Sequence, residues 1–106
     1  MARTLIHMQG NARRGEVMQI RTLIGHVMET GYRVDAQGQL VPRDIIRRFP
    51  CRYNGEPVFA AELFAAIAAN PFIEFSTVAI DSGALTFEWE GDNGFVHLES
   101  VALRVT

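Results

Sequence analysis

Lysine is absent from this chain of 106 residues, so arginine supplies all ten basic side chains. Twelve acidic residues leave a formal net charge of −2. A dedicated nucleic-acid-binding protein usually carries a strongly basic face, so the charge balance argues against nucleic acid as a partner. With 48% hydrophobic and 21% charged residues, the composition also excludes an intrinsically disordered chain.

Long apolar runs are absent as well. No segment approaches the roughly 20 apolar residues that a transmembrane helix needs. Residues 1–7 lack the apolar core and the small-residue cleavage site of a secretory signal peptide. Taken alone, the sequence predicts that no segment spans a membrane and that the protein is cytoplasmic, or mature and exported by some other route.

Cysteine occurs once, at Cys51, which excludes an internal disulfide. Three interpretations stay open. The thiol is a small buried hydrophobic group, as free cysteine commonly is; or Arg47 or Arg52 activates it by lowering its pKa; or it forms a disulfide with a partner subunit. The same region holds the densest positive cluster, which is either a solvated strand face or a surface that pairs with carboxylates or attracts anions. Its members are Arg43, Arg47, Arg48 and Arg52.

Recognisable catalytic and metal-binding motifs are missing. There is no Gly-rich phosphate loop, nucleophile elbow or Cys-x-x-Cys pair. His7, His26 and His97 are scattered, whereas zinc needs three or four convergent ligands. Blue copper needs two His, a Cys and an axial Met, but no Met follows Cys51. The acidic residues at 88–92 lack calcium-loop spacing and are interpreted as a polar turn. We therefore expect no metal site and no cofactor.

Alternation of apolar and polar residues, the pattern of a half-buried strand, runs through most of the chain. In residues 17–24 the even-numbered positions are the more apolar and should point inward. Leu85, Phe87 and Trp89 form a second inward stripe within residues 84–90. Residues 31–42 form a hairpin-like excursion around a turn at Gly38. Other extended segments are expected at 4–8, 45–53, 57–64, 72–80 and 96–105.

Three local irregularities are predicted. Pro50 cannot donate to a ladder, so the strand over 45–53, whose odd-numbered residues should share one face, is expected to be an edge strand or to contain a bulge. Residues 65–69 have room for about one helical turn before Pro71. The last strand changes its apolar phase after Leu98, which predicts a bulge near Glu99.

Seven to eight short strands separated by Gly, Asn and Asp turns, with almost no helix, predict an all-β fold. The pattern is typical of an antiparallel immunoglobulin-like β-sandwich. The Cys–Trp–Cys signature of antibody domains is absent. The length is near the commonest domain size, and no linker or repeat interrupts it, so residues 1–106 are expected to form a single domain.

Several stretches, taken in order, resemble the SoxZ family of bacterial sulfur oxidation. The resemblance extends from about residue 14 to residue 105. Each stretch alone is a weak signal, and their combination is fairly specific. The stretches are residues 26–31, 42–49 with the cysteine that follows, 70–75, Ser82-Gly83 and 85–89.

The resemblance implies a non-catalytic β-sandwich subunit of a carrier complex in thiosulfate oxidation. SoxZ-like proteins pair with SoxY, which carries the sulfur substrate covalently on the cysteine of a mobile C-terminal Gly-Gly-Cys-Gly-Gly arm. Residues 102–106 do not resemble that arm, which implies the non-carrying subunit. It is expected to form a heterodimer or larger complex with SoxY and to make transient contacts with other Sox enzymes.

The resemblance also implies sites and a location. Cys51 is expected to be an inter-subunit or buried thiol, and the location is expected to be the periplasm, reached by co-export with a signal-bearing SoxY. An unrelated immunoglobulin-like interaction module is the alternative, and it predicts no stable SoxY complex. A thiol-dependent enzyme would instead need an accessible Cys51 of low pKa. The residues expected at the partner surface are His26, Met28, Glu29, Arg43 and Arg47.

Overall fold

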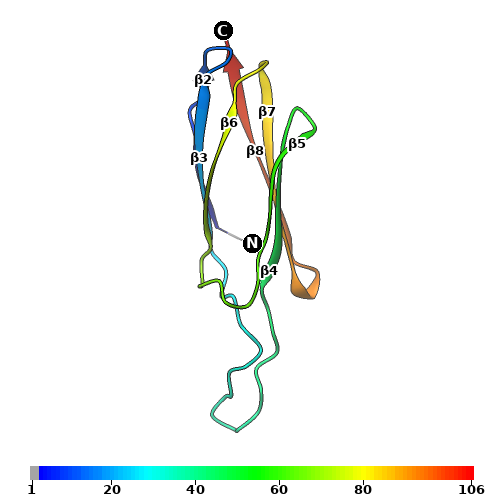
Figure 1. Cartoon of the computed structure of the whole chain (residues 1–106). Helices are drawn as coiled ribbons and strands as arrows, with labels where there is room; N and C mark the ends of the chain where they lie inside the picture. Colours follow the sequence, from blue (N-terminus) through cyan, green and yellow to red (C-terminus); the bar gives the residue numbers. More distant parts are fainter. Residues whose placement is uncertain (1–2) are drawn as a thin grey trace.

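Two facing β-sheets make up the computed structural model, which describes residues 3–106 (Figure 1). The pairing is antiparallel throughout except between β2 and β8, which are parallel. One sheet has the order β1 (Thr4–His7), β3 (Val17–Ile24), β6 (Phe72–Val78). The other has the order β2 (Asn11–Ala12), β8 (Val96–Val105), β7 (Gly83–Gly91), β4 (Ile46–Tyr53), β5 (Glu56–Glu62). A short 3-10 turn, η1 (Asp92–Gly94), joins β7 to β8. The predicted all-β immunoglobulin-like sandwich is confirmed.

The core lies between the two sheets and is centred on Phe49 of β4. Its ring lies 5.0–6.3 Å, centroid to centroid, from four other aromatic rings. These rings belong to Phe59, Phe75, Phe87 and Trp89, and Phe75 comes from the opposite sheet. The inward stripes predicted on β3 and β7 are both buried, so alternation identified the core side of these strands correctly.

The prediction of an edge strand at Pro50 is wrong, because β4 lies between β7 and β5. The bulge alternative holds: the register with β7 shifts between Ile46 and Arg48, and the register with β5 shifts after Cys51. The first shift buries Ile46 and leaves Arg47 exposed, so the predicted single face of odd-numbered residues is broken. In β4, Arg48 and Cys51 have partners in β7, and Pro50, which lies between them, has none. The sheet therefore tolerates the missing N–H of Pro50.

Two further local predictions are wrong. Residues 65–69 form a turn, closed by a bond from Ile67 N to Phe64 O (3.0 Å), rather than a helical turn. Strand β8 pairs with β7 in one unbroken register, without the bulge expected near Glu99. The apolar phase changes because Val96 and Leu98 point outward, where they are 58% and 61% exposed, and not because the strand slips.

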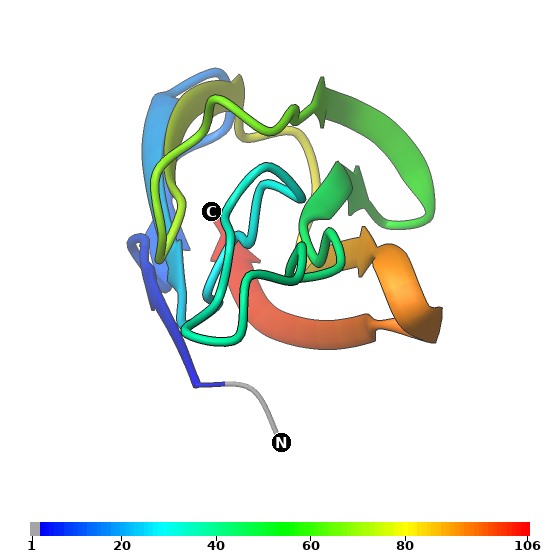
Figure 2. The ribbon, with the colours of Figure 1, turned by 90° about the horizontal axis from the view of Figure 1, so that it is seen from below.

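The molecule is elongated, with extents of 59 × 20 × 20 Å. Its radius of gyration is 16.2 Å, against about 13 Å for a compact chain of this size. The difference arises from residues 25–45, here called the long hairpin, which project beyond the ends of both sheets (Figure 1). Seen from below, the hairpin lies in front of the space between the two sheets (Figure 2). Isolated bridges at Glu29–Asp44 and Val34–Leu40 pair its two arms, which confirms the predicted excursion. In the part of the chain that is described, no helix has the length and apolarity to span a membrane.

Candidate partner-binding surface

The long hairpin leaves β3 through a clamp between His26 and Asn70. The Asn70 side-chain oxygen accepts a hydrogen bond from the His26 N–H (3.0 Å), and the Asn70 N–H donates to the His26 carbonyl (2.8 Å). Asn70 has φ of 55°, a left-handed conformation that asparagine tolerates better than most residues. The clamp therefore fixes the start of the hairpin against the segment that leads into β6.

The His26 imidazole forms part of the hairpin base. Its Nδ1 accepts a hydrogen bond from the Met28 N–H (3.0 Å), which places the proton of the neutral ring on Nε2. Nε2 lies 3.7 Å from Asp44 Oδ1, and the ring packs edge-on against Phe95 with centroids 5.0 Å apart. The side chain is only 7% exposed, so His26 offers a partner little more than one ring edge.

Met28 lies beneath this surface rather than on it. Met28, one of the residues expected at the partner surface, is only 4% exposed. Its sulfur accepts a hydrogen bond from the Ile46 N–H (3.3 Å) at the start of β4, which ties the hairpin to the five-stranded sheet. Met28 therefore supports the surface from inside the fold.

Glu29 belongs to the first rung between the two hairpin arms. Its backbone N–H and carbonyl each bond to Asp44 at 2.8 Å. Its carboxylate accepts a hydrogen bond from Arg33 at 2.8 Å, which holds the pKa of Glu29 below its ordinary value. Of this ion pair, the Arg33 side chain is exposed, whereas the Glu29 side chain is only 17% exposed.

Asp92 in η1 connects the hairpin to the sheet. Its carboxylate accepts a bidentate pair from Arg43 (2.8 Å to each oxygen) and a bond from the Ile45 N–H (3.1 Å). The Arg47 Nε lies 3.3 Å from the same carboxylate. The Arg43 hydrogen bonds are the main reason that the pKa of Asp92 is held below its ordinary value. The sequence interpretation of this segment as a polar turn missed the role of Asp92.

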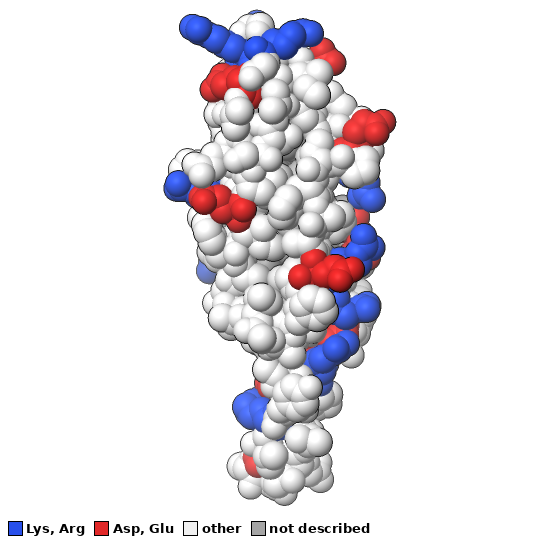
Figure 3. All heavy atoms as spheres, viewed as in Figure 1, with Lys and Arg blue, Asp and Glu red and all other residues white. Residues whose placement is uncertain are grey.

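The remaining arginines of the positive cluster also face carboxylates on the outer surface of the sheet. Arg48 lies 3.7 Å from Glu90, and Arg52 lies 3.7 Å from Glu88. Both pairs cross from β4 to β7, so the cluster is a solvated cross-strand ladder and not an open anion site. Figure 3 shows charged side chains mainly at the top and along the right-hand border of the molecule, with the centre of that face mostly uncharged.

Five predicted residues therefore meet at the hairpin base: His26, Met28, Glu29, Arg43 and Arg47. Their role in partner binding stays a prediction. The structure adds exposed apolar side chains that sequence reasoning had not selected. These are Tyr32, Val34 and Leu40 on the hairpin, with Val96 and Leu98 on β8.

Cys51 lies apart from this surface, inside the core. Its side chain is fully buried between partners Phe59 and Phe87 on the neighbouring strands. Burial raises the pKa of the Cys51 thiol to about 12. Of the three interpretations, the structure supports the buried thiol, because neither an activated thiolate nor a disulfide to a partner fits this position.

We expect Cys51 in the native protein to resist alkylation. With a pKa of about 12, about one thiol in ten thousand is ionised at pH 8, and the thiolate is the reactive form. Iodoacetamide labelling followed by intact-mass spectrometry should show negligible modification of native protein and complete modification in denaturant. Rapid labelling of the native protein, at a rate near that of the denatured chain, would contradict the buried position.

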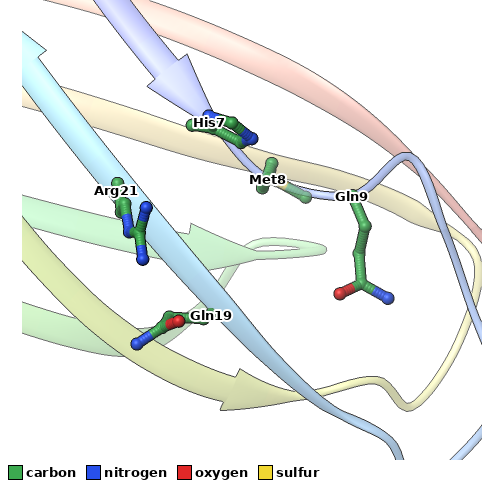
Figure 4. A pocket seen from close by; sticks show the side chains of 5 residues that line it. All are labelled: His7, Met8, Gln9, Gln19 and Arg21. Carbon is green, nitrogen blue, oxygen red and sulfur yellow. The ribbon is translucent and has the colours of Figure 1, made fainter.

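A shallow pocket lies at the outer face of the three-stranded sheet. It has a volume of about 330 Å³ and is lined by His7, Met8, Gln9, Gln19 and Arg21 (Figure 4). Its one cation, Arg21, already bonds Glu74 at 2.6 Å.

Within residues 3–106, no group of three or more His, Cys, Asp or Glu side chains is placed to hold a metal ion.

Comparison with solved structures supports the fold. Superoxide reductase (neelaredoxin) from Ignicoccus hospitalis superposes with a TM-score of 0.71 at 14% sequence identity, covering 97% of this chain and 80% of that one. Two single-residue variants of the same reductase give the same TM-score and identity, with 79% of their chains covered. At this level of identity the likeness concerns the fold alone.

Comparison of the sequence identifies the family. No curated protein matches the chain. The family model described as "Sulphur oxidation protein SoxZ" matches residues 6–102, which is nearly the whole sequence. The match covers the hairpin base, the aromatic core and most of β8. The chain therefore belongs to the SoxZ family of sulfur-oxidation proteins.

Proposed function

We propose that this chain is the binding subunit of a SoxYZ carrier complex in thiosulfate oxidation. It pairs with a SoxY-like subunit, which carries the sulfur substrate covalently on a cysteine of its C-terminal arm. The family match over residues 6–102 is the observation that carries this proposal. In this role the chain catalyses no reaction; it binds SoxY and helps to present the arm to the enzymes of the pathway.

The form of the long hairpin supports a binding role. Tyr32, Val34 and Leu40 are all exposed on it, and exposed apolar groups gathered on one element are typical of interaction sites. The hairpin is held at its base by Asp92 and by the rung between Glu29 and Asp44. A surface that is ordered before binding loses less conformational entropy when the partner arrives.

We expect this chain to form a stable complex with the SoxY-like protein of the same organism. Co-expression followed by size-exclusion chromatography with light scattering should give one species with the summed mass of both subunits, or a multiple of it. An obligate interface of roughly 2,000 Å² or more should keep the subunits together at micromolar concentration.

Fractionation of the same cells should place this chain in the periplasm only when the SoxY-like partner carries its signal peptide.

The control is the same SoxY-like protein co-expressed with an unrelated immunoglobulin-like domain, which should elute separately. Elution of two folded subunits as separate species would contradict the proposed pairing. An immunoglobulin-like interaction module with another partner would then become the better interpretation. Periplasmic delivery of this chain without the partner would contradict co-export while leaving the pairing intact.

A further inference from the structure

The open edge of β8 differs from the other strand edges of the sandwich. Edge strands are usually protected by short length, proline or charged side chains. Strand β1 has four residues, β5 contains Pro57 and ends in Glu62, and β6 carries Glu74 at its centre. Strand β8 has ten residues and no proline, and its two charged side chains are Glu99, which is bonded to Thr4 on the inner face, and Arg104, which lies where β2 pairs. Within residues 3–106, only β2 pairs with it on the side away from β7, and that pairing covers just Arg104 and Val105.

Successive residues of β8 direct their backbone N–H and C=O groups to alternate sides of the strand, which shows which groups face this edge. The Gly91 N–H donates to the Phe95 carbonyl (2.9 Å). Bonded and non-bonded pairs alternate in an antiparallel ladder, so the odd-numbered residues of β8 bond to β7. The even-numbered residues point the other way, and the Arg104 N–H accordingly donates to Gly10 on the β2 side (2.9 Å). Positions 96, 98, 100 and 102 therefore present backbone donors and acceptors to the open edge, here called the β8 edge.

Side chains along the β8 edge add a pattern of apolarity and charge. Val96 and Leu98 are exposed on the outer face. On the inner face the Glu99 carboxylate accepts a bond from Thr4 (2.7 Å) and contacts His97 (3.0 Å). These two bonds, that from Thr4 first, hold the pKa of Glu99 below its ordinary value. The β8 edge therefore has two exposed apolar side chains on its outer face and one carboxylate on its inner face.

We propose that the β8 edge accepts an extended segment of the SoxY-like subunit as an added β-strand. This inference rests on the function proposed above and specifies where the pairing occurs. Strand addition supplies main-chain hydrogen bonds for affinity, and alternate side chains supply selectivity. The added segment spans up to seven residues, roughly 24 Å, before β2 blocks further pairing at Arg104.

The chemistry of the added segment follows from charge complementarity. Opposite charges directly across a strand pair stabilise it, and like charges destabilise it. The segment should therefore place a basic or hydroxyl side chain opposite Glu99 and apolar side chains beside Val96 and Leu98. The edge also continues into the hairpin base, because Phe95 at the foot of β8 packs on His26, so one partner could cover both.

A second copy of this chain suits the β8 edge less well. Two copies related by a two-fold axis would pair their β8 strands antiparallel. All four outward-pointing positions, 96, 98, 100 and 102, have partners in such a pair only when the axis passes through Glu99. That register sets two ionised Glu99 side chains opposite each other, which is unfavourable. Moving the axis to Leu98 removes this conflict but brings position 102 opposite Gly94, which lies in the η1 turn, so the ladder shortens.

Residue-resolved amide exchange of the isotope-labelled chain, alone and in complex with the unlabelled SoxY-like subunit, tests the proposal. The amides of Leu98, Ser100 and Ala102 should exchange rapidly in the free chain and at least tenfold more slowly in the complex. The amides of Glu99 and Val101, already bonded to β7, provide the internal control and should change little.

Substitutions provide the second readout. Ser100→Pro removes one outward N–H at a position where an edge strand tolerates proline, and should weaken the complex about tenfold or more. Ser100→Ala keeps the N–H and should leave the affinity unchanged. Leu98→Arg should also weaken binding, whereas Val17→Arg, at a similarly exposed site on the other sheet, should not. Thermal unfolding of each free variant would show that all remain folded.

The outcomes separate this inference from the proposed function. A wild-type complex whose β8-edge amides stay unprotected, or which binds Ser100→Pro as tightly as Ser100→Ala, would overturn strand addition while leaving the pairing intact. Equal losses from Leu98→Arg and Val17→Arg would also overturn it. Protection of the same amides in the free chain at high concentration would identify a second copy as the occupant. Absence of any wild-type complex would overturn the proposed function and this inference together.

Discussion

Replacing Phe49 with alanine is expected to lower the free energy of unfolding by about 3–5 kcal/mol. Phe49 is fully buried, and its ring contacts Phe75 from one sheet and Trp89 from the other. The substitution therefore removes apolar contacts and leaves a cavity between the layers. Urea unfolding followed by far-UV circular dichroism measures the effect. Because whole domains are stable by only about 5–15 kcal/mol, the variant should also lose much of its capacity to bind a partner.

Phe72→Ala is the matched control for this prediction. It removes the same side chain from β6 at a position that is 59% exposed, and exposed substitutions usually change stability by about 0.5 kcal/mol or less. If the two variants unfold at the same urea concentration with the same slope, the aromatic cluster does not hold the sheets together as the structure indicates.

The parts of the fold that could be predicted are the strands in which alternation of apolar and polar residues identifies the buried face. In β3 and β7 each inward position is apolar, or a threonine that bonds across the sheet, as Thr22 does to the Ile73 carbonyl (3.1 Å). Alternation within one strand depends only on the pleat, so no knowledge of the neighbouring strands is needed. The fold class followed from the number of such strands and the turns between them.

Predictions that depended on which strands are neighbours failed. Pro50 indicated an edge because proline usually avoids central strands, but a register shift on each side of it allows a central position. The change of apolar phase after Leu98 was interpreted as a bulge, because an apolar side chain does not show by itself whether it faces the core or the outer surface. The hairpin residues named from the family resemblance do meet in space, whereas Asp92 was missed because its partner Arg43 lies 49 residues away.

Replacing Asp92 with alanine is expected to loosen the base of the long hairpin without unfolding the sandwich. The substitution removes the acceptor for Arg43 and for the Ile45 N–H, and a hydrogen bond to a charged group is worth roughly 1.5–3 kcal/mol. Amide exchange at Glu29 and Asp44, which bond to each other across the two arms, should accelerate by between about tenfold and a hundredfold. Affinity for the SoxY-like subunit should fall with it, because the partner would then have to order the hairpin.

The pH dependence of the same contact has a definite sign. The pKa of Asp92 is lower in the folded chain than its ordinary value. Its contribution to stability is therefore fully present above that ordinary value and is lost as the pH falls through the folded pKa. The difference in unfolding free energy between wild type and Asp92→Asn, which keeps the shape but not the charge, should be constant above about pH 5 and shrink in stronger acid.

Asp35→Ala separates an effect at the base of the hairpin from one at its tip. The Asp35 carboxylate accepts hydrogen bonds from the Gln37 and Gln39 N–H groups within the tip turn (2.9 and 3.0 Å). Its replacement should therefore disturb that turn while leaving exchange at Glu29 and Asp44 unchanged. Equal acceleration in both variants would mean that the hairpin opens as one unit from either end. Unchanged exchange in Asp92→Ala would mean that the Glu29–Asp44 rung and the Asn70 clamp hold the base without the carboxylate.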